Sequence, residues 1–221
     1  MPFFFRKTPL MIKELLKILD NDTNKDVLNV VVTGKTGVGV SSLINLITGS
    51  ASAPISTNVK PCTISFKAYN VIIHGTHFRL IDTPGFDGPT DKSANITKSL
   101  AEFTFKYGID LVVHCIRDND VGSQAYHAIR SVVSPDVPIV TVVTALEGYG
   151  SSMDEWWSRN EAALKRRQIT FSDHACVTTL APDTSDAELQ ARLMKSAEEV
   201  KHLILRSCFA SPREATEGWF P

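Results

Sequence analysis

The feature that most constrains the fold of this chain is the run "NVVVTGKTGVGVSSLINLITG", Asn29–Gly49. It begins with consecutive β-branched residues, which favour a buried strand. Gly34, Gly37 and Gly39 follow, and glycine permits tight or left-handed turns that other residues resist. The next residues, "SSLINLI", have leucine and isoleucine at helical spacing. The run therefore predicts a strand, a glycine-rich turn and a helix in direct succession.

The rest of the chain continues this alternation of strands and helices. Continuous valine- and isoleucine-rich segments predict buried strands at Leu28–Thr33, Asp110–Ile116, Pro138–Thr144 and His174–Thr178. Helical spacing occurs at Ile96, Leu100 and Phe103, and again at Leu189, Leu193, Val200 and Ile204. The segment "SFKAYNVIIHGTHFRLID" predicts a hairpin that turns at residues 74–76. We therefore expect an α/β three-layer sandwich, with a mostly parallel six-stranded sheet, one antiparallel strand and helices on both faces.

The chain divides into three predicted parts. Residues 1–26 contain an amphipathic helix and a linker, with Ile12, Leu15, Leu16 and Leu19 on one helical face. Residues 27–208 form the α/β domain, and residues 209–221 form a flexible tail without periodicity. The helix is expected to pack on the domain or on a partner. Peripheral contact with a membrane is the alternative.

Composition excludes several classes of function. The 221 residues carry a formal net charge of −1, so no nucleic-acid partner is expected. The chain has neither an apolar run that could cross a bilayer nor a secretory signal. The four cysteines form no CxxC or CxxH pair, and Cys115 and Cys176 fall in apolar strand-like runs. We therefore expect a cytoplasmic protein with reduced, buried thiols.

The glycine-rich turn has the spacing of a phosphate-binding loop, G-x-x-x-x-G-K-[ST], except at one position. Gly34, Gly39 and Ser41 are in register, but Val40 stands where lysine is due. In such a P-loop, backbone N–H groups surround the β-phosphate at a helix N-terminus, and the serine ligates Mg²⁺. The fold is thus expected to be of the P-loop NTPase type; the alternative is a turn that binds no ligand. The predicted nucleotide-binding residues here are Gly34, Lys35, Thr36, Gly37, Val38, Gly39, Val40, Ser41 and Ser42.

Two further segments predict a metal and γ-phosphate site. "LIDTPGFDG" contains the motif D-x-x-G as Asp82 to Gly85. Asp82 is expected to hold Mg²⁺ through water, and the Gly85 amide to contact the γ-phosphate. Thr63, in "VKPCTIS", precedes the hairpin at the place where a switch threonine closes over the metal. The predicted metal residues are therefore Ser41, Thr63 and Asp82.

A base-reading loop is predicted after the strand "VPIVTVV". The segment "TALE", Thr144 to Glu147, stands where an N/T-K-x-D motif is due, with Ala145 in place of the lysine. A carboxylate can accept from the N1–H and N2–H₂ donors of guanine, a pair that adenine lacks, so Glu147 favours guanine. Thr178 and Thr179, in "ACVTTLAP", complete the predicted base contacts. The alternative is that Glu147 is a solvated loop residue.

Together the motifs "GKTGVGVSSLIN", "PCT", "IDTPGF" and "VVT" before "ALE" resemble those of septin-related GTPases. That group includes the septins, the immunity-associated GTPases, the chloroplast-import receptors and the stand-alone G-domain proteins of mushrooms, which the chain resembles most. The similarity covers roughly residues 28–207. It implies a G domain that binds GTP and GDP with Mg²⁺, and a nucleotide-dependent homodimer. The departure from the pattern is Val40.

Three cations could replace the missing lysine: Lys35 in the loop, Arg117 at the end of a predicted strand, and Lys60 before the hairpin. Lys35 is the preferred candidate, and Lys35, Thr63 and Gly85 are the predicted catalytic residues. Phe86 follows the D-x-x-G motif, where many small GTPases have a water-orienting glutamine, so slow hydrolysis is expected. Two alternatives remain open. One is a pseudo-GTPase that serves as a binding or assembly module, and the other is an ATP-specific P-loop NTPase.

Overall fold

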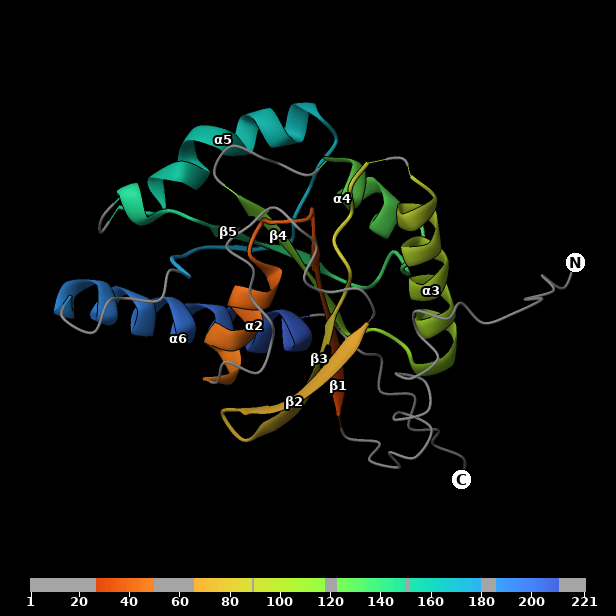
Figure 1. Cartoon of the computed structure of the whole chain (residues 1–221), viewed down its shortest axis with the longest axis horizontal. Helices are drawn as coiled ribbons and strands as arrows, with labels where there is room; N and C mark the ends of the chain where they lie inside the picture. Colours follow the sequence, from red (N-terminus) through yellow and green to blue (C-terminus); the bar gives the residue numbers. More distant parts are fainter. Residues whose placement is uncertain are drawn as a thin grey trace, which may run out of the picture.

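The computed structural model describes residues 27–49, 66–88, 90–117, 123–149, 152–179 and 186–210. The strands are β1 (Leu28–Gly34), β2 (Lys67–Ile73), β3 (Thr76–Asp82), β4 (Leu111–Arg117), β5 (Ile139–Thr144) and β6 (His174–Cys176). The helices are α2 (Val40–Thr48), α3 (Asp91–Tyr107), α4 (Ser123–Arg130), α5 (Glu155–Arg166) and α6 (Ala187–Ala210), with a 3-10 turn η1 (Glu147–Tyr149). Figure 1 shows these helices arranged around one central sheet.

The six strands form one sheet in the order β2-β3-β1-β4-β5-β6. β2 pairs with β3 in antiparallel register, and every other neighbouring pair is parallel. This confirms the predicted α/β fold with one antiparallel strand. Because β1 lies between β3 and β4, its carboxyl end is flanked by two other strand ends. Ligands of open α/β sheets bind at such carboxyl ends, at the point where the strand order reverses.

The two faces of the sheet support separate hydrophobic clusters. Val30 and Val32 belong to the cluster that includes apolar residues of α2 and α6. Val31 faces the opposite side, where the cluster includes residues of α3, α4 and α5. Side chains of successive strand residues point to opposite faces, so a strand covered on both sides needs apolar residues at every position. The uninterrupted valine run is therefore explained by helices on both faces.

The last strand is shorter than predicted. Sequence analysis places it at His174–Thr178, whereas β6 ends at Cys176. One further bond to β5 follows, from the N–H of Val177 to the oxygen of Val143 at 2.9 Å, and the N–H of Thr178 then donates to the hydroxyl of Ser196 on α6, 3.2 Å away. The helix therefore contacts the loop that follows this strand.

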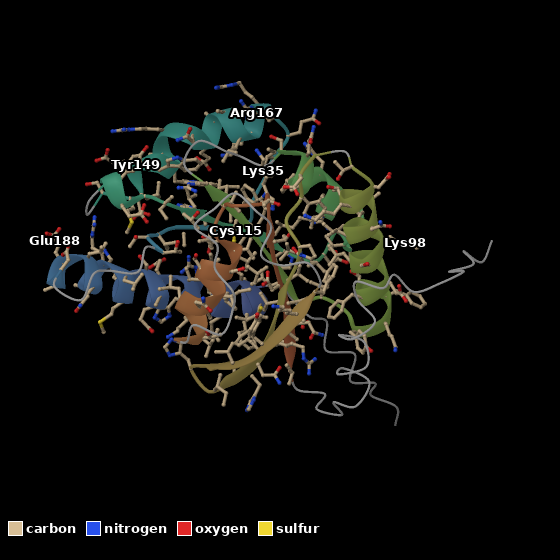
Figure 2. The ribbon with its side chains drawn as sticks, viewed as in Figure 1. Lys35, Lys98, Cys115, Tyr149, Arg167 and Glu188 are labelled. Atoms are coloured by element: carbon tan, nitrogen blue, oxygen red, sulfur yellow. The ribbon has the colours of Figure 1, made fainter. Side chains whose placement is uncertain are left out.

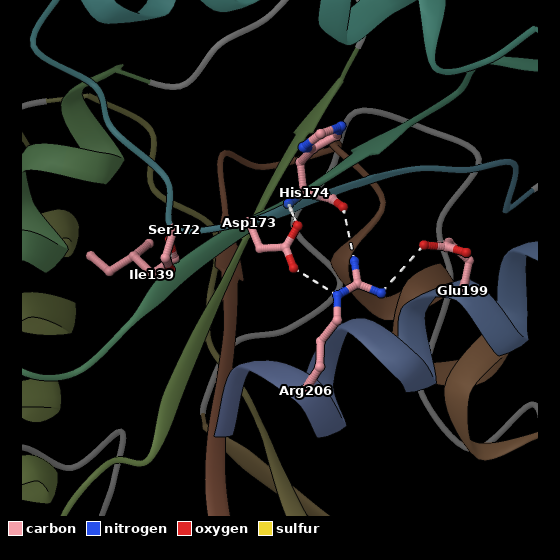
Figure 3. A network of polar contacts seen from close by, with 6 residues as sticks. All are labelled: Ile139, Ser172, Asp173, His174, Glu199 and Arg206. Atoms are coloured by element: carbon pink, nitrogen blue, oxygen red, sulfur yellow. Dashed lines mark hydrogen bonds and ion pairs between the residues drawn. The ribbon is translucent and has the colours of Figure 1, made fainter. Parts of the chain in front are cut away.

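Ionic contacts hold α6 against β6 (Figure 3). Arg206 donates from Nε to Asp173 Oδ2 over 2.7 Å, and its Nη1 lies 3.5 Å from Glu199 Oε1. The other carboxylate oxygen of Asp173 accepts from the backbone N–H of His174, 2.7 Å away. These contacts hold α6 at the start of β6, whereas Ser196 contacts Thr178 beyond the other end of the strand.

Several sequence predictions fall outside the described residues. These are the amphipathic helix in 1–26, the tail beyond residue 210, Lys60 and Thr63. Within the described ranges, α6 continues to Ala210, two residues past the expected domain end at 208. No helix in those ranges has the length and apolar character required to span a membrane.

Candidate functional site

The glycine-rich loop connects β1 to α2 and lies closely over the end of β4. A Cβ atom at Gly34 would lie 2.7 Å from the backbone oxygen of Cys115, so only glycine fits there without displacing β4. Gly37 and Gly39 have positive φ angles of 86° and 99°, which other L-residues rarely adopt. The first helical bond of α2 runs from the N–H of Leu43 to the oxygen of Gly39, at 2.8 Å. Gly39 is therefore a left-handed residue of the turn and the N-cap of α2, which begins at Val40.

The first turn of α2 favours an anion. It consists of Val40, Ser41 and Ser42, contains no acidic residue, and receives no side-chain cap from Gly39 within the described part of the chain. The first N–H groups of a helix have no intrahelical acceptor and carry a partial positive charge. Val40 is half-buried and packs against the cluster beneath α2. Since Val40 replaces the lysine of the P-loop pattern, the loop offers an anion its backbone N–H groups without the ammonium of that lysine.

The D-x-x-G segment runs beside this loop. β3 places Asp82 opposite Val32 of β1, and the chain then continues with a bond from the N–H of Phe86 to the oxygen of Gly34, at 3.0 Å. A Cβ atom at Gly85 would lie 2.7 Å from both Cα and N of Thr36. Gly85 therefore contacts the loop backbone directly. The sequence spacing predicts this neighbourhood, and the structure provides it.

Buried polar groups at this edge suit a hydrated cation. Asp82 is fully buried at the end of β3, and buried carboxylates require donors, water or a metal nearby. The hydroxyls of Thr33 and Thr83, also buried, make no hydrogen bond with any described residue. The carboxylate of Asp82 and the hydroxyl of Ser41 are hard oxygen ligands of the kind that Mg²⁺ takes, together with several waters. The residues present therefore fit a Mg²⁺ site. The third predicted metal residue, Thr63, lies outside the described ranges.

Charges around the loop affect neighbouring groups. Burial, with a secondary contribution from the Asp82 carboxylate, raises the pKa of the Cys115 thiol far above its usual value. Burial also acts to raise the pKa of Asp87, but hydrogen bonds from Thr36 and Lys92, together with the charges of Lys92 and Lys35, lower it overall. Figure 2 shows Lys35 and Cys115 above α2 in this view. The ammonium of Lys35 is therefore close enough to Asp87 to favour its ionised form.

Thr144 fixes the loop to the sheet. Its hydroxyl lies 2.5 Å from the oxygen of Val38 and 3.2 Å from that of Ile116, and it is fully enclosed. The sequence motif predicts that Thr144 takes part in base reading, but it does not predict this contact with the loop. No local sequence signal marks this contact, because it joins residues that are far apart in the chain.

Arg117 reaches the outer side of the loop. Its Nη1 donates to the oxygen of Gly37 over 3.4 Å, and the side chain is exposed. Lys35, also exposed, lies where the loop meets Phe86 through an isolated parallel bridge. Two of the three candidate cations are therefore at the loop, whereas Lys60 lies outside the described residues.

The predicted base-reading residues meet beside the loop. The hydroxyl of Thr178 donates to Glu147 Oε1 over 2.9 Å, and Arg192 of α6 donates to the backbone oxygen of Glu147 over 3.3 Å. A Cβ atom at Gly39 would lie 3.7 Å from the hydroxyl of Thr179. Ala145 adopts a left-handed conformation with φ 61°, which turns the chain from β5 toward Glu147. The structure thus brings Glu147, Thr178 and Thr179 to the same edge as the loop.

A family comparison agrees with this geometry. The profile of the 50S ribosome-binding GTPase family matches residues 29–145, which include β1, the loop, the D-x-x-G segment and Thr144. The chain belongs to this GTPase family. The chain is therefore a P-loop GTPase of this family, and the loop and the D-x-x-G segment belong to its G domain. Glu147 and Thr178 lie beyond the matched range.

Individual relatives are similar over part of their length. The small ribosomal subunit biogenesis GTPase RsgA of Mycoplasmopsis agalactiae is 32% identical over 114 residues, which is 49% of this chain and 36% of RsgA. Toc33 from Arabidopsis thaliana, solved as a dimerization-deficient mutant, has a TM-score of 0.63 at 15% identity and covers 94% of this chain and 96% of its own. Era, solved with MgGDPNP and nucleotides of 16S ribosomal RNA, has a TM-score of 0.60 at 18% identity over 89% of this chain and 60% of its own. The two structures share the fold of this GTPase.

Proposed function

We propose that this chain binds GTP and GDP together with Mg²⁺ and hydrolyses GTP slowly, through a P-loop that has valine in place of lysine. The observation that carries the proposal is the Glu147–Thr178 pair beside a glycine loop and helix N-terminus of a GTPase family. We also propose the septin-related subgroup, on the motifs "GKTGVGVSS" and "IDTPGF". A reducing, cytoplasmic location is supported by the buried free thiols of Cys115, Cys176 and Cys208.

The phosphates would be held mainly by the backbone. The N–H groups of residues 37–42, which run from the loop into the first turn of α2, would surround a phosphate at the helix N-terminus, where the partial charge of the helix favours an anion. Without the lysine, the site loses a charge contact that is typically worth about 2–5 kcal/mol. Lys35 can restore part of this loss, because its charge already acts near Asp87 and its backbone bridges to Phe86. A γ-phosphate beside Gly85 would then compete with Asp87 for the ammonium.

The metal would be held by Ser41, by Thr63 in the triphosphate state, and by Asp82 through water. When bound, Mg²⁺ would supply positive charge that offsets the negative charge of the phosphates. Phe86 is buried at the end of the D-x-x-G segment and cannot orient a water molecule through a side-chain amide. We infer that turnover is slow, because losing one positioning group commonly costs about 10²–10³ in rate.

Glu147 would read the base. Thr178 donates to one carboxylate oxygen, and Arg192 holds the backbone of the same residue. These two contacts orient the carboxylate before a base arrives, which reduces the cost of ordering it on binding. Guanine offers two donors to such a carboxylate, and adenine does not, so discrimination against ATP is expected.

The base assignment is tested by thermal stability with each nucleotide. Saturating GDP and Mg²⁺ at about 100 times Kd contributes about 2.7 kcal/mol, which should raise Tm by roughly 5–10 °C for a chain of this size. ADP should raise Tm far less. Glu147→Gln should remove the preference, whereas Glu188→Gln, at an exposed position of α6, should keep it. Equal shifts from adenine and guanine nucleotides in the wild type would rule out guanine reading.

Replacing charges in the loop tests the role of Lys35. Lys35→Ala should weaken the binding of a non-hydrolysable GTP analogue more than Val40→Lys strengthens it. Lys98→Ala removes an exposed lysine of α3, distant from the loop (Figure 2), and should leave the dissociation constant unaltered. If Lys35→Ala behaves like Lys98→Ala, compensation by Lys35 is refuted.

A pseudo-GTPase that serves as an assembly module is the second candidate, favoured by Val40 and Phe86. Release of phosphate by purified protein, with GTP or ATP as substrate, separates it from a slow GTPase and from an ATP-specific enzyme. We propose in addition a nucleotide-dependent homodimer without a nucleic-acid partner, to be checked by sedimentation with GDP and with the GTP analogue.

A further inference from the structure

A cluster of metal-ligating side chains lies outside the nucleotide site. His74, Glu198 and His202 are all exposed, and their ligand atoms lie within 4.8 Å of one another. The cluster joins two elements that are distant in sequence, the β2–β3 hairpin and α6. Figure 1 shows the turn of that hairpin projecting beneath α2 and α6 in this view.

The two residues on α6 share one face of the helix. Glu198 and His202 are four residues apart, which places their side chains on successive turns of the same face. The ring of His74 stacks on that of His202, with centroids 4.8 Å apart and an interplanar angle of 21°. Nε2 of His74 lies 3.7 Å from Oε2 of Glu198. The hairpin and the helix therefore present three ligand atoms to a common point.

The backbone holds His74 in an uncommon conformation. His74 and Gly75 form the two-residue turn between β2 and β3, with φ angles of 46° and 84°. Such turns strongly prefer asparagine, aspartate or glycine at the first position, because a left-handed conformation is unfavourable for larger side chains. The turn therefore has a histidine in a backbone conformation that is unfavourable for it. In this conformation the imidazole lies against His202 of α6.

The two carboxylate oxygens of Glu198 face different partners. Lys201 donates to Oε1 over 2.8 Å, whereas Oε2 is the atom that faces His74. One oxygen can thus retain the lysine while the other ligates an ion.

We propose that His74, Glu198 and His202 form a site for a divalent transition-metal ion of the Zn²⁺ class. Two imidazoles and a carboxylate suit Zn²⁺, Co²⁺ or Ni²⁺, whereas Mg²⁺ prefers oxygen ligands. Tetrahedral Zn²⁺ has bonds of about 2.0–2.2 Å to such ligands, with water in the fourth position. The ligand atoms must therefore approach one another by roughly an ångström, which exposed side chains achieve by small rotations.

This site is separate from the proposed Mg²⁺ site. β3 extends from Thr76, beside the hairpin turn, to Asp82 at the loop, a path of about 20 Å at about 3.3 Å per residue. An ion at the turn would fasten the edge hairpin to α6. Since β3 is continuous to Asp82, the same ion would restrict movement of the strand that carries the D-x-x-G segment.

Titration of the full chain with Zn²⁺ in the absence of nucleotide tests the proposal. Wild-type protein should bind one Zn²⁺ at this site, with a rise in Tm, and Co²⁺ at the same site should give the visible absorption of a four-coordinate complex. His202→Ala, Glu198→Gln and His74→Asn should each weaken Zn²⁺ binding by about tenfold or more. Asparagine is used at position 74 because it tolerates the left-handed backbone, so the turn stays folded.

Two exposed histidines provide matched controls. His77 lies on the same hairpin and His127 on α4, and neither belongs to the cluster. His77→Ala and His127→Ala should leave the affinity for Zn²⁺ unchanged, as should Ser41→Ala and an excess of Mg²⁺. The proposal is overturned if wild-type protein binds no Zn²⁺, or if the cluster variants bind it as tightly as the controls do.

Discussion

The hydroxyl of Thr144 lies beneath the phosphate loop, within hydrogen-bonding distance of carbonyl oxygens from both the loop and β4. Thr141, on the same strand, has an equally buried hydroxyl that donates to the oxygen of His114 over 2.9 Å. The two threonines differ in what they hold. Thr144 contacts the loop, whereas Thr141 only joins neighbouring strands.

Replacing each threonine with valine separates stability from ligand binding. Thr144→Val and Thr141→Val should each lower the free energy of unfolding by about 1–3 kcal/mol, because buried carbonyl groups lose a donor. Only Thr144→Val should also weaken GDP binding, by roughly tenfold for about 1.4 kcal/mol of lost loop order. Urea denaturation and calorimetric titration measure the two effects. Equal GDP affinities in both variants would mean that Thr144 does not shape the loop.

Residue types and spacing predict that four residues lie at the same edge of the sheet, because parallel strands place their carboxyl ends together. These residues are Gly34, Gly39, Asp82 and Glu147. The structure has all four at that edge. The spacing cannot predict that Thr144 anchors the loop or that Lys35 acts on Asp87. Those contacts depend on side-chain directions and on the close approach of separate strands, which no local pattern specifies.

At the scale of elements, α6 is held by its ionic contacts with β6. Burial acts to raise the pKa of Asp173, but hydrogen bonds from Arg206 and the His174 amide, and the charges of both residues, lower it from its ordinary value. A carboxyl whose pKa is lower in the folded state stabilises that state at pH values above its pKa in the unfolded chain. This stabilisation is lost as the pH falls through the pKa of the folded state.

Asp173→Asn should therefore destabilise the protein by less than about 1 kcal/mol near neutral pH, since the ion pair is partly exposed. The difference from wild type should shrink below about pH 4, where the wild-type carboxyl also becomes neutral. Urea denaturation at pH values from neutral to below about 4 measures the difference in the free energy of unfolding. Glu188→Gln serves as a control at an exposed carboxylate. A pH-independent difference would show that the ion pair contributes nothing and that asparagine disturbs packing instead.

At the scale of the whole molecule, the reactivity of three buried thiols can measure how often the domain opens. These are the thiols of Cys115, Cys176 and Cys208. Burial raises the pKa of Cys176 and Cys208 to about 12 and that of Cys115 further. Because the thiolate is the reactive form, these cysteines should react only in molecules that have opened.

In a Cys62→Ala variant, we expect almost no reaction with Ellman's reagent in the native state and immediate reaction in concentrated guanidinium chloride. An added Ser158→Cys, at an exposed position of α5, should react at once under native conditions and so verify the reagent. Rapid native reaction of the three buried thiols would contradict the packing described for both faces of the sheet.

The central position of β1 has a consequence for synthesis on the ribosome. β1 and its loop leave the ribosome before any other described element, yet their neighbours come later: β3 and β4 pair with β1, Thr144 ends β5, and Thr179 follows β6. Pairings between distant segments form slowly and leave strand edges exposed meanwhile. The part of the chain that would hold the nucleotide is therefore translated first and completed last, and a nascent chain that ends before residue 179 lacks the surroundings that shape its loop.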